Sequence, residues 1–306
     1  MAKNRRGRKI SGIIILDKPQ GETSNRSLQK VKRLLDAAKA GHTGSLDPLA
    51  TGVLPLCFGE ATKISQFLLD SDKAYRTTIR LGVKTDSGDS DGESINTCDP
   101  SSITLSILEK ALENFRGDIE QIPSMFSALK HKGVPLYKLA RQGKTVERKV
   151  RHVTIHELKL LNFTSGSEAE VELEVHCSKG TYIRMIADDL GDLLGVGGHL
   201  IALRRIKAGP FDLEDSHSFE ELERLLNEAE DFTAIDALLV PADHAIEDIP
   251  SVALTVDAAA LIKQGQVVSV QDLLAEGLVR LYDTDIFIGI GIVQEDGRLA
   301  PRRLFV

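Results

Sequence analysis

The sequence predicts an α+β fold with a mixed sheet, followed by a small β-rich C-terminal domain. Strand-like and helix-like segments succeed one another without a strict alternation, which argues against an all-parallel sheet. From Ser251 onward the pattern changes to short apolar segments separated by glycine turns. The chain has 306 residues, 42% of them apolar, which suffices for one large or two ordinary domains with sizeable cores.

Several elements follow from local pattern alone. The aliphatic run Gly12–Asp17 predicts a buried strand, because a Pro-Gln-Gly turn comes directly after it. Ser24 is a candidate N-cap, since apolar residues recur at the helical period from Leu28 to Ala38. No regular element fits the first half of residues 41–63. The remaining expectations are helices at 61–71, 103–115, 135–142, 181–194 and 218–229, strands at 74–82, 150–161, 169–177 and 199–206, and a polar loop at 85–100.

The expected organisation is a basic disordered tail at 1–9, a main domain at 10–245 and the C-terminal domain at 251–306. The net charge of −7 hides a strong segregation of charge. Residues 212–250 hold 13 acidic residues and a single arginine, whereas residues 130–151 hold eight Lys or Arg and one Glu. Such a basic segment can neutralise phosphates, although a solvated surface explains it equally well on charge alone.

Several functional classes are excluded by what the sequence contains. No apolar run approaches the roughly 20 residues of a membrane helix. Three widely spaced cysteines form neither a disulfide framework nor a CxxC metal pair, so we expect a reducing compartment, the cytoplasm. Neither a complete phosphate-binding loop nor a dinucleotide fingerprint is present. The acidic loop near Asp89 fails the calcium-loop pattern at its first and twelfth positions, and we expect no metal and no cofactor.

Two segments carry residues suited to chemistry. In the first, GHTGSLDPLATGVLP at 41–55, Asp47 precedes a proline and is therefore held extended, outside a helix. Without further knowledge, an Asp-Pro turn with a structural aspartate is the simpler interpretation. In the second, HCSKGTYIR at 176–184, Arg184 follows a glycine-broken junction between strand and helix. An arginine beside a carboxylate would keep it ionised and oriented, but spacing alone does not bring Asp47 and Arg184 together.

The segment at 41–55 resembles the catalytic motif of the bacterial TruB family, the tRNA pseudouridine-55 synthases. Four further segments occur in the order typical of that family: LDKPQGETSN at 16–25, KAYRTTIRLG at 73–82, CSKGTYIRMIADDLG at 177–191 and HLIALRRIKAGPF at 199–211. The resemblance is strong over residues 10–211. It is weaker from 251 to 306, where GIGIVQEDGRLAPRRLF is similar to a PUA-like RNA-binding domain.

The resemblance implies a mixed-sheet pseudouridine synthase fold, an activity and a set of site residues. Asp47 would be the catalytic carboxylate, Arg184 its partner, and Tyr75 the ring that stacks on the target base. The other implied substrate-binding residues are His42, Tyr182, Leu203 and Lys18. The implied reaction isomerises uridine 55 in the T loop of tRNA to pseudouridine after the base is extruded. It is redox-neutral and releases nothing, so it requires no cofactor.

The resemblance also implies the partner, which is the T arm of tRNA, contacted by a basic insertion at about 124–152. We expect a monomer that requires no protein partner and does not bind membranes. One departure concerns the family's Pro-Pro-x-Tyr-Ser-Ala pattern, which here reads Pro123-Ser124-Met125-Phe126-Ser127-Ala128 and lacks a tyrosine hydroxyl. The acidic stretch 212–250 has no evident catalytic role and is expected to face away from RNA.

Two alternatives remain at this stage. The basic insertion and the C-terminal domain would also serve an RNA-binding or RNA-folding module in which catalysis is secondary. Modification of another RNA that mimics the T arm is the second alternative. The presence of Asp47, Tyr75 and Arg184 together argues for an enzyme.

Overall fold

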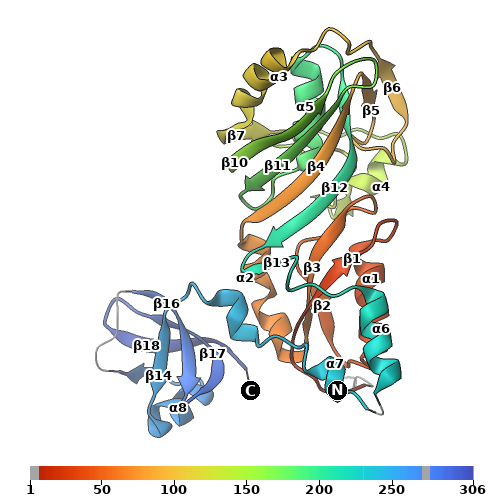
Figure 1. Cartoon of the computed structure of the whole chain (residues 1–306). Coiled ribbons are helices and arrows are strands. Elements are labelled where there is room, and N and C mark those ends of the chain that lie inside the picture. Colours follow the sequence, from red (N-terminus) through yellow and green to blue (C-terminus); the bar gives the residue numbers. More distant parts are fainter. Residues whose placement is uncertain (1–6, 230, 271–275, 306) are drawn as a thin grey trace.

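The computed structural model describes residues 7–229, 231–270 and 276–305. Its largest element is a nine-stranded sheet, in which β1-β3-β12-β4-β11-β10-β7 lie side by side, with β2 on β3 and β13 on β12 (Figure 1). These strands are β1 (Gly12–Lys18), β2 (Ala40–His42), β3 (Thr51–Phe58), β4 (Lys73–Leu81), β7 (Gly117–Gln121), β10 (Arg151–Thr164), β11 (Glu170–Cys177), β12 (Gly198–Ala208) and β13 (Phe211–Asp212). The predicted mixed sheet is confirmed, because β3 and β12 run parallel and the other neighbours run antiparallel.

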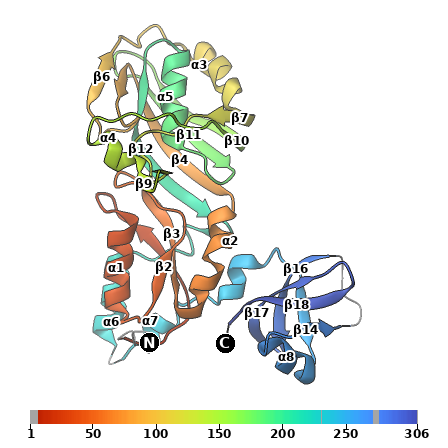
Figure 2. The ribbon, with the colours of Figure 1, turned by 180° about the vertical axis from the view of Figure 1, so that it is seen from behind.

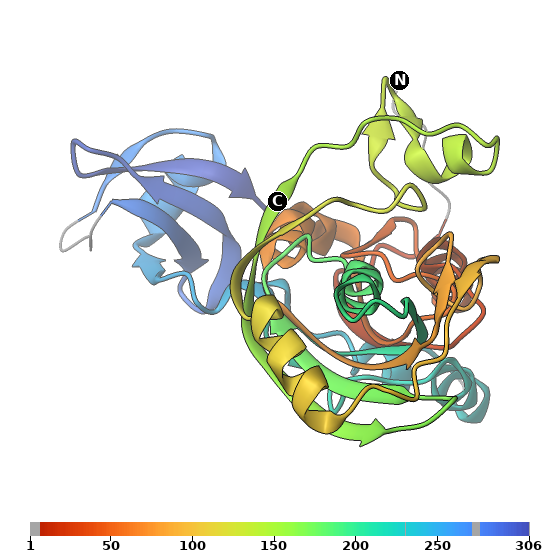
Figure 3. The same cartoon turned by 90° about the horizontal axis from the view of Figure 1, so that it is seen from above.

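Helices pack against the sheet and share its hydrophobic core. In the view from above, the sheet curves around α5, and the connection between β7 and β10 extends beyond it (Figure 3). Seen from behind, α1 and α6 lie together on the half of the molecule that holds β1 and β3 (Figure 2). The helices are α1 (Ser24–Leu34), η1 (Gly59–Ile64), α2 (Ser65–Asp70), α3 (Leu105–Leu112), η2 (Glu113–Phe115), α4 (Leu136–Ala140), α5 (Ile183–Leu193), α6 (Phe219–Glu228), α7 (Thr233–Asp236) and η3 (Ala242–Ile246).

The two halves of the large sheet are joined at a narrow parallel contact. Only Thr51 with Arg204 and Gly52 with Arg205 are paired between β3 and β12. Gly52 has φ +99°, and a Cβ at this position would overlap the carbonyl oxygen of Arg205. Glycine is therefore required here both for the backbone conformation and for the close approach of the two strands.

We expect Gly52→Ala to destabilise the protein by about 2–5 kcal/mol, because it adds a steric overlap to the strain of a positive φ. The measurement is the free energy of unfolding from chemical denaturation. The matched control is Gly21→Ala, where φ is +81° but the space around the added methyl is open, and where we expect a loss of about 1 kcal/mol. Equal losses in the two variants would contradict the role assigned to the close approach.

The residues after 250 build a second sheet with its own core. Its strands, in the order β14-β16-β17-β18-β15, pack with α8 to one side of the larger body (Figures 1 and 2). The elements are β14 (Ser251–Leu254), α8 (Val256–Lys263), β15 (Val268–Ser269), β16 (Gly277–Asp283), β17 (Ile286–Val293) and β18 (Arg298–Leu304). The predicted β-rich character is confirmed, but α8 was not expected. Ile290 joins a core cluster with Ile13 and Phe211, so the two sheets share packing.

Several local expectations were wrong in detail. Thr23, not Ser24, is the N-cap of α1, and its hydroxyl accepts from the amide of Arg26 at 3.2 Å. Where a polar loop was expected at 85–100, the chain forms a hairpin that begins two residues earlier, with strands β5 (Val83–Thr85) and β6 (Ser94–Thr97). The expected helix at 61–71 is split into η1 and α2, and β2 lies at the start of the segment for which no element was expected.

The two charged segments take different forms. The basic insertion carries a short hairpin of β8 (Lys130–His131) and β9 (Val134–Pro135), followed by α4. In the acidic stretch, α6 buries Leu222 in the main core and contacts β1, so its apolar side is structural. The predicted basic tail lies mostly outside the described residues, since they begin at Gly7. In the part of the chain that the structure covers, every helix is too short or too polar to cross a membrane.

Candidate active site

A cavity of about 370 Å³ lies where the loop after β2 meets the start of α5 and the middle of the sheet. Five of the predicted site residues line it together: Asp47, Tyr75, Tyr182, Arg184 and Leu203. They come from the loop, from β4, from the start of α5 and from β12. Segments that are far apart in the sequence therefore converge on one pocket.

The loop that carries Asp47 is fixed by contacts to the body of the protein. The hydroxyl of Ser24 accepts from the amide of Leu46 at 2.7 Å and donates to the Leu46 carbonyl at 3.1 Å. The amide of Gly21 donates to the Pro48 carbonyl at 2.8 Å. The Asp47 side chain is 42% exposed to the pocket. Among the described residues no backbone N–H donates to its carboxylate, which argues against the purely structural Asp-Pro turn.

The partner of Asp47 is Arg184, whose side chain is only 6% exposed. Its Nε lies 3.0 Å from Oδ2 of Asp47. Its other nitrogens are fixed as well: Nη1 donates to the Ser87 carbonyl at 3.0 Å, and Nη2 donates to the Phe126 carbonyl at 2.9 Å. Nη1 also lies 3.5 Å from Oδ2 of Asp89, which is equally buried. The guanidinium therefore aims one N–H at Asp47, while the loop of Ser87 and Asp89 and the segment of Phe126 hold it in place.

Opposing effects act on the ionisation of Asp47. Burial raises the pKa of Asp47, the charge of Arg184 lowers it, and the charges of Asp89 and Asp91 raise it. The net pKa of Asp47 lies above the ordinary value for an aspartate. A carboxylate that is partly desolvated and held by one guanidinium is suited to attack an electrophile or to accept a proton.

Removing the charge of Asp89 by Asp89→Asn should lower the pKa of Asp47, because a negative neighbour disfavours the ionised carboxylate. The Asp47 carboxyl would then stay ionised to lower pH. An NMR titration of the ¹³C-labelled carboxyl of Asp47 measures this midpoint directly. Asp91→Asn is the matched control: Asp91 is exposed and acts on Asp47 more weakly, so a smaller shift in the same direction is expected. A midpoint that moves to higher pH in Asp89→Asn contradicts this account.

Tyr75 and Leu203 form the part of the pocket contributed by the sheet. Tyr75 on β4 lies in register between Val175 of β11 and Arg205 of β12. Burial raises the pKa of the Tyr75 phenol, and the Arg205 guanidinium beside it opposes that rise. Leu203 is 9% exposed and points to the same side of β12 as Arg205. An aromatic ring and an aliphatic side chain thus flank the space above the strands.

Tyr182 stands at the N-cap of α5 and is held through its backbone. The buried side-chain amide of Gln121 on β7 accepts from the Tyr182 amide at 3.0 Å and donates to the Tyr182 carbonyl at 3.2 Å. This clamp fixes the first turn of α5, which carries Arg184. Sequence reasoning missed Gln121, because a glutamine at the end of an otherwise exposed strand gives no signal.

Two predicted residues do not line the pocket. Lys18 is fully buried, and its Nζ donates to the carbonyls of Pro19 at 2.8 Å and Glu22 at 2.7 Å. Burial lowers the pKa of Lys18 to about 8. His42 has a buried Nδ1 without a hydrogen-bond partner, and burial followed by the charge of Arg205 lowers its pKa. Neither residue is among those that line the cavity.

Arg205 and Lys73 line the pocket but were not predicted. Nζ of Lys73 donates to the carbonyls of Leu68 at 3.0 Å and Leu69 at 2.9 Å, at the end of α2. The alternation along β12 offered a signal for Arg205, since residues 203 and 205 share one face of a strand. Among the described residues there is no group of three His, Cys, Asp or Glu side chains arranged to hold a metal.

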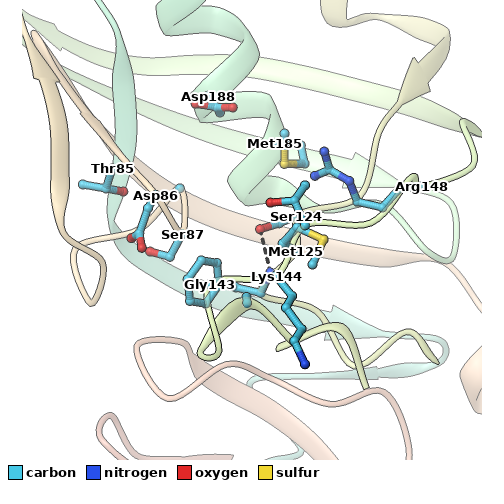
Figure 4. Close-up of a pocket in the computed structure, with 14 residues that line it drawn as sticks. Thr85, Asp86, Ser87, Ser124, Met125, Gly143, Lys144, Arg148, Met185 and Asp188 are labelled. Carbon is cyan, nitrogen blue, oxygen red and sulfur yellow. Dashed lines mark hydrogen bonds between the residues drawn. The ribbon is translucent and has the colours of Figure 1, made fainter. Parts of the chain in front are cut away.

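A second cavity, of about 350 Å³, lies between the basic insertion and the main body (Figure 4). Lys144 and Arg148 of the basic insertion line it together with Ser87 and Asp188 of the main body. The Ser124 hydroxyl accepts from the Phe126 amide at 3.1 Å. Because Phe126 meets Arg184 through its carbonyl, the missing tyrosine hydroxyl noted in the sequence does not affect that contact.

Comparison with known proteins places this geometry in a family. The model of the TruB family pseudouridylate synthase N-terminal domain matches residues 32–183. Models of a tRNA pseudouridylate synthase B C-terminal domain and of a pseudouridine synthase II TruB C-terminal domain match residues 184–247 and 250–305. The chain is 51% identical over 313 residues to tRNA pseudouridine synthase B of Vibrio vulnificus (strain YJ016), covering 100% of this chain and 98% of that protein. It is 52% identical over 298 residues to the protein of that name from Coxiella burnetii, covering 97% and 95%.

Solved structures show the same fold at lower identity. A chain in the structure of an H/ACA RNP bound to a substrate RNA containing 2'-deoxyuridine matches with a TM-score of 0.73 and 24% identity. A chain in the crystal structure of a Cbf5-Nop10-Gar1 complex matches with a TM-score of 0.73 and 25% identity. In both cases the match covers 96% of this chain and 85% of the other.

Proposed function

The chain belongs to the TruB family of pseudouridine synthases, and we propose from this premise that it converts uridine 55 in the T loop of tRNA to pseudouridine. It is a tRNA pseudouridine synthase, an isomerase. The observation that carries the proposal is the ion pair of Asp47 with Arg184 in an open pocket lined by Tyr75.

The proposed reaction uses few protein groups. The N1–C1′ bond of the uridine breaks, the base turns, and C5 bonds to C1′. C5 then loses its proton, and N1 gains a proton. The Asp47 carboxylate acts on the sugar or the base during the first step. The charge of Arg184 favours the ionised form of this carboxylate. Arg184 also orients the carboxylate, because the guanidinium is itself held by the carbonyls of Ser87 and Phe126. All atoms of the substrate are kept, so no cofactor is required.

We assign binding roles to the remaining pocket residues. The Tyr75 ring would stack on the extruded base and recover part of the unstacking cost. Leu203 would pack beside the base, and Tyr182 would close the wall at the start of α5. Lys18 and His42 would act indirectly, by stabilising the loop that carries Asp47. A pocket of about 370 Å³ accommodates a single extruded base and not a stacked helix.

The basic insertion, residues 124–152, is the proposed surface for the T arm. Seven of its cationic side chains are exposed, and within the described ranges none of these forms an ion pair: Lys130, Lys132, Lys138, Arg141, Lys144, Lys149 and Arg151. Unpaired exposed cations are suited to phosphates. Recognition would read the shape of the folded RNA through phosphates and 2′-hydroxyls. The acidic residues of α6 lie on another part of the molecule (Figure 1).

We also propose the roles of the two domains, the oligomeric state and the localisation. Residues 10–245 would form the catalytic domain and residues 251–306 a PUA-like domain that extends the RNA contact. The protein would act as a monomer, without a protein partner, in the cytoplasm, where tRNA is available.

The decisive experiment is a carbodiimide primer-extension map of an unmodified tRNA transcript incubated with the protein and no added cofactor. We expect one new stop, at the T-loop uridine, and no stop when that uridine is replaced by cytidine. A transcript that is bound but unmodified would favour the RNA-folding alternative. Stops at other uridines would point to a different RNA target.

A further inference from the structure

Arg205 is a buried cation for which the mechanism above has no use. The residue is 1% exposed and lies on β12 at the contact with β3. Its Nε donates to the Val53 carbonyl at 2.7 Å, whereas its Nη2 is buried without any hydrogen-bond partner. No carboxylate within the described ranges lies within ion-pair distance of it. A buried guanidinium with an unused N–H and no counter-charge is costly, so a compensating role is expected.

The position of this unused N–H is informative. Arg205 lines the pocket of Asp47 and is the register partner of Tyr75 on β4. On the other side it approaches Gly44, where a Cβ would lie 3.2 Å from Nη1. Gly44 has φ +66°, and its lack of a side chain leaves room for the buried guanidinium between the loop and the strand. Arg205 therefore lies in the wall of the pocket that is proposed to receive the base.

The charge of Arg205 also affects the residues around the pocket. The pKa values of Lys18 and Lys73 are both lowered to about 8, chiefly by burial, and the charge of Arg205 contributes to each lowering. Three basic side chains, Lys18, Lys73 and Arg205, therefore lie close enough to influence one another, and Asp47 is the acidic side chain that lines the cavity. Such a site favours a ligand that becomes negative.

We propose that Arg205 is a further catalytic residue, whose guanidinium donates a hydrogen bond to a carbonyl oxygen of the detached uracil. The inference rests on the proposed function. When the N1–C1′ bond breaks, its electron pair stays with the base, and the negative charge spreads onto the carbonyl oxygens. When C5 bonds to C1′, the pair forms the new bond and the charge disappears. Arg205 remains protonated throughout and acts as an oxyanion donor prepared in advance.

The test compares single-turnover rates at saturating protein with tRNA affinities. We expect Arg205→Gln to lower the rate constant by about 10²–10³-fold, as for loss of one oxyanion donor, with Kd unchanged within about threefold. Arg204→Gln is the matched control, because Arg204 is the neighbouring residue on the opposite face of β12 and pairs with Asp17. We expect its rate to stay within a few-fold of wild type.

A leaving-group experiment separates catalysis from a structural role. A 5-fluorouridine at the target position makes the detached base a better leaving group, so it needs less stabilisation. Because fluorine on C5 blocks the final proton loss, disappearance of the 5-fluorouridine is measured by nuclease digestion and chromatography. We expect the defect of Arg205→Gln to shrink at least about tenfold on this substrate. A purely structural defect would be the same on both substrates.

The outcomes distinguish the two proposals. If the wild-type protein leaves the T-loop uridine unmodified, the proposed function itself fails. If wild type is active, three results for Arg205→Gln would overturn the role of Arg205. These are a normal single-turnover rate, a change in Kd alone, and equal rate defects on the uridine and 5-fluorouridine substrates. Should Arg205→Gln fail to fold, Arg205→Lys keeps the charge but loses the planar geometry. We expect Arg205→Lys to have a smaller rate defect than Arg205→Gln, and this defect must also shrink on the 5-fluorouridine substrate.

Discussion

Replacing Asp47 with asparagine is expected to lower pseudouridine formation by more than about 10³-fold, because a neutral amide can neither attack an electrophile nor accept a proton as the carboxylate does. The side chain keeps its shape, so the pocket and the contact to Arg184 are largely preserved. The measurement is the single-turnover rate of tritium release from tRNA labelled at C5 of the T-loop uridine.

Binding provides the control for this variant. Asp47 contributes no positive charge, so the affinity for tRNA should stay within about threefold of wild type. Asp72→Asn removes a carboxylate outside the pocket and should retain full activity. Appreciable tritium release by Asp47→Asn would exclude Asp47 as the catalytic carboxylate. If the inactive variant still accelerates refolding of tRNA, an RNA-folding role operates beside catalysis.

The sequence was most informative where chemistry and local pattern coincide. Strand β1 and helix α6 were predicted to within one residue at every end, since an aliphatic run and a Ser218 cap are local signals. The motif containing Asp47 was found by resemblance, because a loop rich in glycine has no period from which a fold can be derived. Its chemistry became visible only with the residues that surround it.

Contacts to the backbone, some of them over long sequence distances, explain most of what was missed. Arg184 is held by the backbone carbonyls of residues 87 and 126. Every residue type has such a carbonyl, so the sequence does not reveal which residues act as acceptors. Gln121 acts in the same way on the backbone of Tyr182. The hairpin of β5 and β6 was expected to be a loop, because its strands are short and polar. Lys18 was assigned to substrate, yet it is buried against main-chain carbonyls.

Replacing Arg184 should also have a large effect, and it should act on both catalysis and stability. Arg184→Lys keeps the charge, but a single ammonium cannot reach Asp47 and the carbonyls of Ser87 and Phe126 in the fixed planar arrangement of a guanidinium. We expect the single-turnover rate to fall by about 10²–10³-fold, because the carboxylate loses its orientation. Rates near wild type in this variant would mean that charge alone suffices.

Stability gives an independent reading of the same network. Arg184→Met removes the charge and leaves Asp89, whose side chain is 6% exposed, without its cation. Breaking a buried pair in this way should cost about 3–5 kcal/mol in the free energy of unfolding. The matched control is Arg76→Met, since the pair of Arg76 with Glu174 is largely exposed and should contribute less than about 1 kcal/mol. Equal losses in the two variants would show that the Arg184 network is no more than a surface contact. A large loss confined to Arg184→Met, together with a rate defect in Arg184→Lys, would show that one buried guanidinium both stabilises the fold and orients Asp47.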